Sequence, residues 1–110
     1  MSVLDSFLMN GKVVIITGGC GFLGMQYARA FIEVGATVIL FDYCDETRMV
    51  ECVKELDVWQ YIGSRLDALM VDITNYPELV LAVKNVEQKL GAVHVLINNA
   101  GLNPTVGSDE

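Results

Sequence analysis

The sequence is poor in the residues that build metal sites and disulfide frameworks. It contains one histidine and three cysteines, Cys20, Cys44 and Cys52, and no pair of cysteines forms a C-x-x-C motif. A structural zinc site usually takes four Cys or His ligands at short spacings, and a disulfide framework takes an even number of cysteines. Neither is supported here, so we expect no metal and reduced, mostly buried thiols.

Basic residues are also scarce. Seven Lys and Arg stand against fourteen Asp and Glu, which gives a net charge of -7, and the Lys and Arg residues form no cluster along the chain. Proteins bind nucleic-acid phosphates through a basic surface. We therefore expect no nucleic-acid partner.

Long apolar runs are missing as well. The longest runs, 36–41 and 93–97, are far shorter than the roughly 20 residues that cross a bilayer as a helix. The N-terminus carries Asp5 and has neither a basic flank nor a small-residue cleavage site, so no secretory signal is expected. These features predict a cytoplasmic protein without a membrane partner.

What the chain does have is a globular composition. Apolar residues make up 53% of it and charged residues 19%, a balance typical of a packed core, and 110 residues fit a single domain spanning 1–110. Short apolar runs alternate with segments of helical periodicity that end at Gly35, Gly63 and Gly91. The predicted strands are 12–17, 36–41, 66–71 and 92–98, and the predicted helices are 21–34, 45–61 and about 77–90.

Strands that alternate with helices of this length indicate parallel pairing, because a parallel neighbour needs a long crossover. Right-handed crossovers then predict an α/β fold, a Rossmann-like doubly wound parallel sheet with strand order 3-2-1-4 and three helices. Ligands bind such a sheet at its topological switch point, here between the first and fourth strands. In the first helix, apolar residues recur at helical spacing, namely Leu23, Tyr27, Ala30, Phe31 and Val34.

The segment "GCGFLG" at 19–24 fits the dinucleotide-binding pattern G-x-G-x-x-G, and it lies directly between a predicted strand and a predicted helix. In that pattern Gly19 permits the tight turn, Gly21 lets a diphosphate approach the backbone, and Gly24 lets the helix pack closely on the strand. The free N–H groups at the start of the helix favour phosphate. A glycine-rich turn without a ligand is the alternative interpretation of the same residues.

Asp42 follows Gly24 by 18 residues, at the end of the second predicted strand. An acidic side chain at this position can accept hydrogen bonds from the adenosine ribose hydroxyls, and it would repel a 2'-phosphate. The sequence therefore favours NAD over NADP. A solvated strand end without a ligand is the alternative for Asp42.

The segments "TGGCGFLG" at 17–24, "VDIT" at 71–74 and "NNAG" at 98–101 together resemble the short-chain dehydrogenase/reductase family, over the whole chain from about Phe7. The resemblance implies hydride transfer between a nicotinamide dinucleotide and an alcohol or carbonyl. It also implies that Asp72 and Ile73 lie near the adenine and that the Asn-Asn-Ala-Gly segment lies beside the cofactor. The predicted cofactor-binding residues are Gly18, Gly19, Cys20, Gly21, Phe22, Leu23, Gly24, Asp42, Asp72, Ile73, Asn98, Ala100 and Gly101.

The sequence departs from the family pattern in two details. The spacing of Gly18, Gly21 and Gly24 is similar to the extended, epimerase-type branch, whereas "NNAG" is similar to the standard dehydrogenase branch, which we favour. His94 stands where the family often has an acidic residue before the fourth strand. We expect it to make a structural hydrogen bond rather than to act as a base.

The catalytic residues of the family are absent from this sequence. Members of the family normally run to about twice this length or more, and their serine and Tyr-x-x-x-Lys lie beyond the segment that matches "NNAG". Tyr61 with Arg65 imitates that spacing, but arginine cannot lose a proton as a lysine can. We therefore expect a domain truncated after the fourth strand that binds the cofactor without turnover on its own.

Two further interpretations stay open. A sheet with an uncovered face and an open edge predicts self-association, so the chain could be a homo-oligomeric, non-catalytic scaffold. Thiol chemistry at Cys20 is another, because a helix N-terminus can lower a thiol pKa. The sequence shows no resolving cysteine for it.

Overall fold

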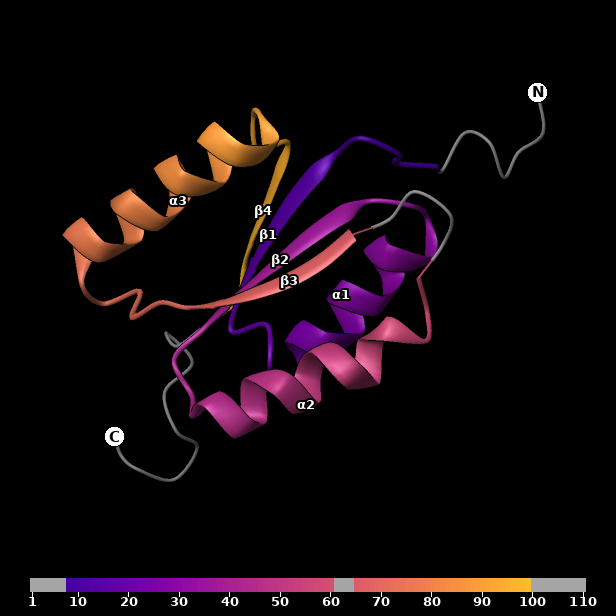
Figure 1. Ribbon diagram of the computed structural model, residues 1–110, viewed down its shortest axis with the longest axis horizontal. Coiled ribbons are helices and arrows are strands. Elements are labelled where there is room, and N and C mark those ends of the chain that lie inside the picture. Colours follow the sequence, from indigo (N-terminus) through magenta and orange to yellow (C-terminus); the bar gives the residue numbers. More distant parts are fainter. Residues whose placement is uncertain (1–7, 61–64, 100–110) are drawn as a thin grey trace.

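The computed structural model describes residues 8–60 and 65–99, which form an open α/β sheet (Figure 1). Its four strands are all parallel and lie in the order β3-β2-β1-β4, as predicted. Helices α1 and α2 cover one face and α3 covers the other, so the sheet is doubly wound. The elements are β1 (Val13–Thr17), α1 (Phe22–Glu33), β2 (Thr37–Asp42), α2 (Glu46–Asp57), β3 (Arg65–Met70), α3 (Tyr76–Leu90) and β4 (Val95–Asn98).

Most boundaries lie within one residue of the sequence-based expectation, and two differ by three residues or more. Helix α2 was expected to reach about Tyr61 but ends at Asp57, because Trp59 and Gln60 donate to carbonyls three residues back rather than four. Strand β4 was expected from Ala92 but begins at Val95. Strand β1 itself starts at Val13, and its register pairs Val14 with Val95, so the residues before His94 have no strand to join.

The core forms two layers because the central strands are apolar on both faces. Alternate residues of β1 and β2, including Val14, Ile16 and Leu40, pack against α1 and α2. The intervening residues, including Ile15 and Phe41, pack against Ala82 and Val86 of α3. Every residue of β1 is buried, as expected for a central strand of a parallel sheet.

The buried residues of α1 are not those of the apolar spacing in its sequence. Leu23 and Tyr27 are 50% and 37% exposed, whereas Gly24, Ala28 and Ile32 are buried. Small residues face inward because this helix begins against the backbone of the preceding loop, where a large side chain has no room. The apolar spacing thus located the helix, and Phe31 packs against the core, but Gly24, Ala28 and Ile32 are the buried residues of α1.

Helices α2 and α3 begin with side-chain caps. Asp45 Oδ1 accepts a hydrogen bond from the Arg48 N–H at 2.8 Å, and Asn75 Oδ1 accepts from the Glu78 N–H at 3.2 Å. Pro77 lies in the first turn of α3, where its missing N–H is not needed. Among the described residues, no helix is both long enough and apolar enough to cross a membrane.

Candidate functional site

The loop between β1 and α1 is held in shape by contacts that only glycine allows. Gly18 has a positive φ of 65°, so the left-handed turn falls on Gly18 rather than on Gly19 as predicted. A Cβ on Gly19 would lie 2.7 Å from Cβ of Leu40, and a Cβ on Gly24 would collide with the carbonyl oxygen of Gly18. Gly24 therefore permits close packing, as predicted, but against the loop backbone.

Gly21 differs from these glycines because its side of the loop is open. It is exposed, and the nearest atom to a Cβ built there is Gly18 O at 3.4 Å. Gly21 is the N-cap of α1, and among the described residues no side chain caps this helix. The first helical hydrogen bond runs from the Met25 N–H to Gly21 O, which leaves the N–H groups of residues 22–24 without a partner in their own helix.

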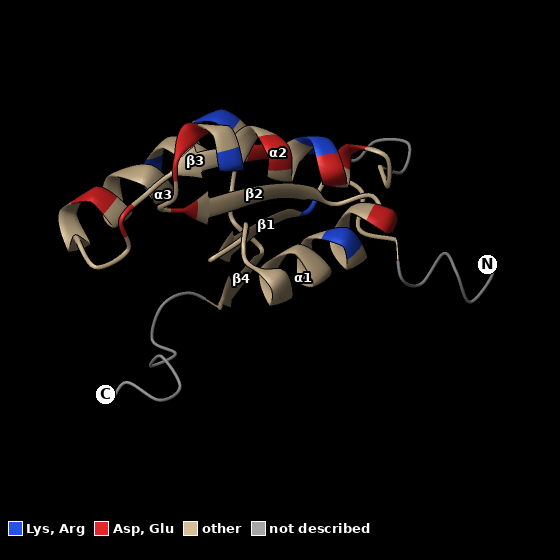
Figure 2. Ribbon diagram, turned by 90° about the horizontal axis from the view of Figure 1, so that it is seen from below, with Lys and Arg blue, Asp and Glu red and all other residues tan. Residues whose placement is uncertain are grey.

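The charge around this helix start favours an anion. The first turn of α1 contains no acidic residue. In Figure 2 the start of this helix is tan, without the red that marks Asp and Glu. The chain as a whole is acidic, but the helix dipole and free N–H groups act locally. The loop thus presents free backbone N–H groups to which a phosphate can bind.

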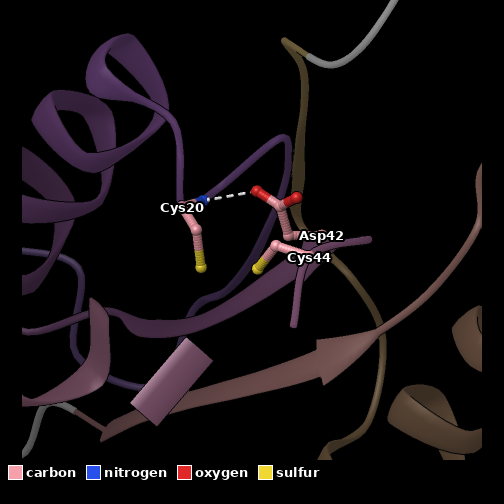
Figure 3. Close-up of side chains that lie close together, drawn as sticks. All are labelled: Cys20, Asp42 and Cys44. Carbon is pink, nitrogen blue, oxygen red and sulfur yellow. Dashed lines mark hydrogen bonds between the residues drawn. The ribbon is translucent and has the colours of Figure 1, made fainter. Parts of the chain in front are cut away.

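Asp42 ends β2 beside this loop. Its Oδ2 accepts a hydrogen bond from the Cys20 N–H at 2.8 Å (Figure 3). Its Oδ1 accepts a hydrogen bond from the Tyr43 N–H at 2.7 Å. The side chain is half-buried, and each carboxylate oxygen keeps a further lone pair. Asp42 is therefore fixed in position and can still accept hydrogen bonds from hydroxyl groups.

A hollow of about 270 Å³ brings four of the predicted residues together, Gly18, Asp42, Asp72 and Ile73. It is lined by residues from the glycine loop and from the carboxyl ends of β2 and β3, namely Gly18, Phe41, Asp42, Tyr43, Val71, Asp72, Ile73 and Thr74. A second hollow of about 300 Å³ shares Phe41, Ile73 and Thr74 with it and reaches Thr17, Leu96 and Asn98. The two together follow the carboxyl edge of the sheet, where ligands of such folds bind.

A larger hollow, of about 510 Å³, lies between α2 and β3. It is lined by side chains such as Val50, Lys54 and Met70, and none of the predicted cofactor residues contributes to it. We therefore assign the site to the carboxyl edge of the sheet.

Asp72 forms the turn that places Ile73 at the hollow. Its Oδ1 accepts from the Thr74 N–H at 3.0 Å and from the Thr74 hydroxyl at 2.6 Å. Its backbone N–H donates to Glu78 Oε2 at 2.9 Å, which ties the turn to α3. The Asp72 side chain thus has a structural role in addition to lining the hollow.

Thr17 connects the glycine loop to β4, and the sequence analysis did not single it out. The buried Thr17 hydroxyl donates to Asn98 Oδ1 at 3.1 Å and accepts from the Asn99 N–H at 3.0 Å. Asn99 Nδ2 donates to Gly18 O at 3.3 Å. The position of Thr17 directly before the glycines was the available signal. The predicted residues Ala100 and Gly101 lie outside the described residues.

His94 makes the expected structural hydrogen bond. Its imidazole Nδ1 accepts a hydrogen bond from the backbone N–H of Val13 at 3.0 Å, and the backbone N–H of His94 donates to Val13 O at 2.9 Å. The imidazole thus provides an acceptor for the first backbone N–H of β1. An acidic side chain at position 94 could accept the same hydrogen bond.

The cysteines lie together beside the glycine loop, which the sequence analysis did not predict. Cys20 and Cys52 are buried and Cys44 is half-buried. Burial is the main cause that raises the pKa of each thiol above its usual value, and a hydrogen bond with Cys52 raises the pKa of Cys20 further. The start of α1 therefore does not lower the pKa of the Cys20 thiol. The fold does place two further thiols, those of Cys44 and Cys52, near Cys20.

Arg48 also reaches this region from α2. Its Nη2 donates to Cys20 O at 2.9 Å, and its Nη1 lies 3.3 Å from Glu55 Oε2 and 3.8 Å from Glu51 Oε1. Sequence reasoning placed no cation beside the glycine loop, because Arg48 is distant from it along the chain.

The parallel order, the glycine loop and the acidic end of β2 define a dinucleotide-binding fold of the Rossmann type. A family model described as short chain dehydrogenase matches residues 12–110. The chain therefore belongs to the short chain dehydrogenase family of oxidoreductases.

Individual relatives agree with this assignment. The chain is 38% identical over 104 residues to a short chain dehydrogenase/reductase of Gibberella zeae, covering 93% of this chain and 37% of that protein. A dehydrogenase/reductase from Mycobacterium ulcerans superposes with a TM-score of 0.79 and 26% identity, over 86% of this chain and 34% of that one. An NAD+-bound xylitol dehydrogenase superposes with a TM-score of 0.76 and 25% identity, over 86% of this chain and 35% of that one. The chain spans about a third of the length of the curated relatives it matches.

Proposed function

We propose that this chain is the NAD-binding part of a short chain dehydrogenase that acts on an alcohol or a carbonyl. The observation that carries the proposal is the hollow where Gly18, Asp42, Asp72 and Ile73 meet beside the uncapped start of α1. The NAD+-bound xylitol dehydrogenase among the similar structures supports the same choice of cofactor.

Each part of the site has a separate task in this proposal. The N–H groups at the start of α1 bind the diphosphate, and Gly21 gives it room to approach. Asp42 accepts hydrogen bonds from the ribose hydroxyls, and Ile73 packs on the adenine. When bound, the nicotinamide supplies a carbon that gives or takes a hydride.

We propose that the acid–base residues of hydride transfer lie outside these 110 residues. No tyrosine of the chain is followed four residues later by lysine. The substrate class, an alcohol or carbonyl compound, is part of the same proposal. On its own the chain would then bind the dinucleotide weakly and perform no turnover. A cytoplasmic location likewise stays a prediction.

Preference for NAD over NADP rests on Asp42. None of the described residues lining the hollow is Lys or Arg, and Arg48 is already bound to Cys20 O and paired with Glu51 and Glu55. The Asp42 carboxylate would repel a 2'-phosphate at short range.

Titration of the chain with NADH and NADPH, followed by calorimetry or fluorescence, tests the proposal. We expect NADH to bind more tightly. The Asp42→Asn variant should weaken NADH binding about tenfold or more, since hydrogen bonds to a charged group contribute about 1.5–3 kcal/mol. It should also reduce the difference between the affinities for NADH and NADPH, because the carboxylate no longer repels the 2'-phosphate. Tighter NADPH binding by the unaltered chain would overturn the role of Asp42.

Self-association is a second candidate, favoured by the surface beside β4. Leu96 is 59% exposed, and the hollow next to it is lined by apolar side chains that include Leu79 and Val83. In the described part of the chain, the outer edge of β4 has no neighbouring strand. We propose that a second copy covers this surface, which would leave a non-catalytic scaffold if neither dinucleotide binds.

Sedimentation velocity at increasing protein concentration tests this second proposal. We expect a dimer or larger species, shifted toward monomer by Leu96→Lys, because a charge on this edge opposes pairing. A sharp monomeric boundary at high concentration would count against it.

A further inference from the structure

Three side chains beside the glycine loop present metal-binding atoms to one another. The Sγ atoms of Cys20 and Cys44 and a carboxylate oxygen of Asp42 all lie within 4.8 Å of each other (Figure 3). They come from the glycine loop, from the end of β2 and from the loop that precedes α2. Residues far apart in the sequence are therefore brought to one point by the fold.

We propose that Cys20, Cys44 and Asp42 form a binding site for one thiophilic divalent ion of the zinc and cadmium class. Two sulfurs and one oxygen match the ligand preference of zinc, whereas magnesium and calcium take oxygen ligands. Cys44 and Asp42 are half-buried, so solvent can reach the ion and supply a water as the fourth ligand. This is the open arrangement of a three-ligand zinc site.

The geometry requires only a small adjustment. With metal–sulfur bonds of about 2.3 Å, ligand atoms of a tetrahedral site lie roughly 3.8 Å apart. The observed separations reach at most 4.8 Å, and Cys44 lies outside any helix or strand, where a change of side-chain rotamer can close the gap. Cys52 is fully buried in the core between the sheet and helices α1 and α2, and it is not a ligand in this proposal.

Binding involves no oxidation or reduction. The ion forms two metal–sulfur bonds and one metal–oxygen bond, and the two thiol protons pass to solvent. Three anionic ligands around a divalent ion leave one net negative charge. The Arg48 guanidinium, which donates to Cys20 O at 2.9 Å, lies beside the site and offsets that charge.

The site shares Asp42 with the proposed dinucleotide site. An ion on the carboxylate would occupy the atoms that the ribose hydroxyls need, so metal and dinucleotide should exclude each other. This exclusion rests on the proposed function, whereas binding of the ion does not.

The test is a titration of the reduced 110-residue chain with Cd²⁺ in a buffer free of small thiols, followed by the sulfur-to-cadmium charge-transfer absorption in the ultraviolet. We expect one equivalent to bind. Cys44→Ser should lower the affinity about tenfold or more and remove about half of the absorption, because one of two sulfur ligands is lost. Asp42→Asn should weaken binding and keep the absorption per bound ion.

Cys52→Ala is the matched control, since it removes a nearby thiol that is not a ligand. It should keep both the stoichiometry and the absorption. Unchanged Cd²⁺ binding by both Cys44→Ser and Asp42→Asn would overturn the site, and so would loss of the absorption in Cys52→Ala alone. An NADH titration of the cadmium-loaded chain then tests exclusion, and NADH binding without any Cd²⁺ binding would refute the metal site alone.

Discussion

The three helices within residues 8–60 and 65–99 begin in two different ways. Helices α2 and α3 start with the side chains of Asp45 and Asn75 bonded to backbone N–H groups, and each has an acidic residue in its first turn. Helix α1 starts at Gly21, and within the described residues it has neither a side-chain cap nor an acid in its first turn. Each capped start thus satisfies one of its free N–H groups with its own side chain. The start of α1 has no such side chain, so its N–H groups are available to a ligand.

This contrast separates stability from function on one scaffold. A side-chain cap stabilises a helix by about 1 kcal/mol relative to alanine and by a few tenths of a kcal/mol relative to glycine, so α1, whose N-cap is Gly21, gives up the smaller amount. Here the uncapped start follows the loop whose Gly18 lines the hollow that also collects Asp42 and Asp72. The variants below test whether the two kinds of helix start can be exchanged.

The largest effect is expected from Gly24→Val. A Cβ at this position would collide with Gly18 O and lie 2.9 Å from the Gly19 Cα, so α1 must move away from the loop. We expect the free energy of unfolding to fall by about 3 kcal/mol or more, measured by urea denaturation, together with loss of NADH binding. Retention of native stability would show that the loop and helix are less closely packed than described.

Removal of the caps should have a smaller effect that is confined to stability. Asp45→Ala and Asn75→Ala should each lower the free energy of unfolding by about 1 kcal/mol, because the N–H groups of Arg48 and Glu78 lose their acceptors. NADH affinity should be unchanged in both. A matching loss of affinity would mean that these caps also shape the binding site.

The smallest effect on stability is expected from a charge in the first turn of α1. Leu23 is half-exposed, so Leu23→Glu should fit and should stabilise the helix by a few tenths of a kcal/mol through the dipole. The same charge should weaken NADH binding severalfold relative to Leu23→Gln, and added salt should reduce the difference. Equal NADH affinities of the two variants would argue against a diphosphate at this helix start.

The fold was predictable because its signals are local. The apolar run at 13–17, the glycines after it and the helix-ending Gly35 and Gly91 each act on neighbouring residues, and the parallel order follows from the helical crossovers. The position of Asp42 at the end of β2 was predictable for the same reason, because it depends only on where the second apolar run ends.

What escaped prediction depends on contacts between distant segments. The inward face of α1 is set by the approach of the loop backbone to Gly24, which a hydrophobic stripe does not register. The grouping of Cys20 with Cys44, and the reach of Arg48 to Cys20 O, exist only once β1 and β2 are paired. Neither contact can be predicted from the spacing of these residues along the chain.

The most direct test of the functional start of α1 is Gly21→Asp, which gives this helix the cap that the others have. Gly21 has an extended backbone with φ -80° and ψ 170°, open to any side chain. We predict that the free energy of unfolding rises by about 0.3–1 kcal/mol while NADH binding is abolished in calorimetry. Undiminished NADH affinity in the stabilised variant would contradict the account.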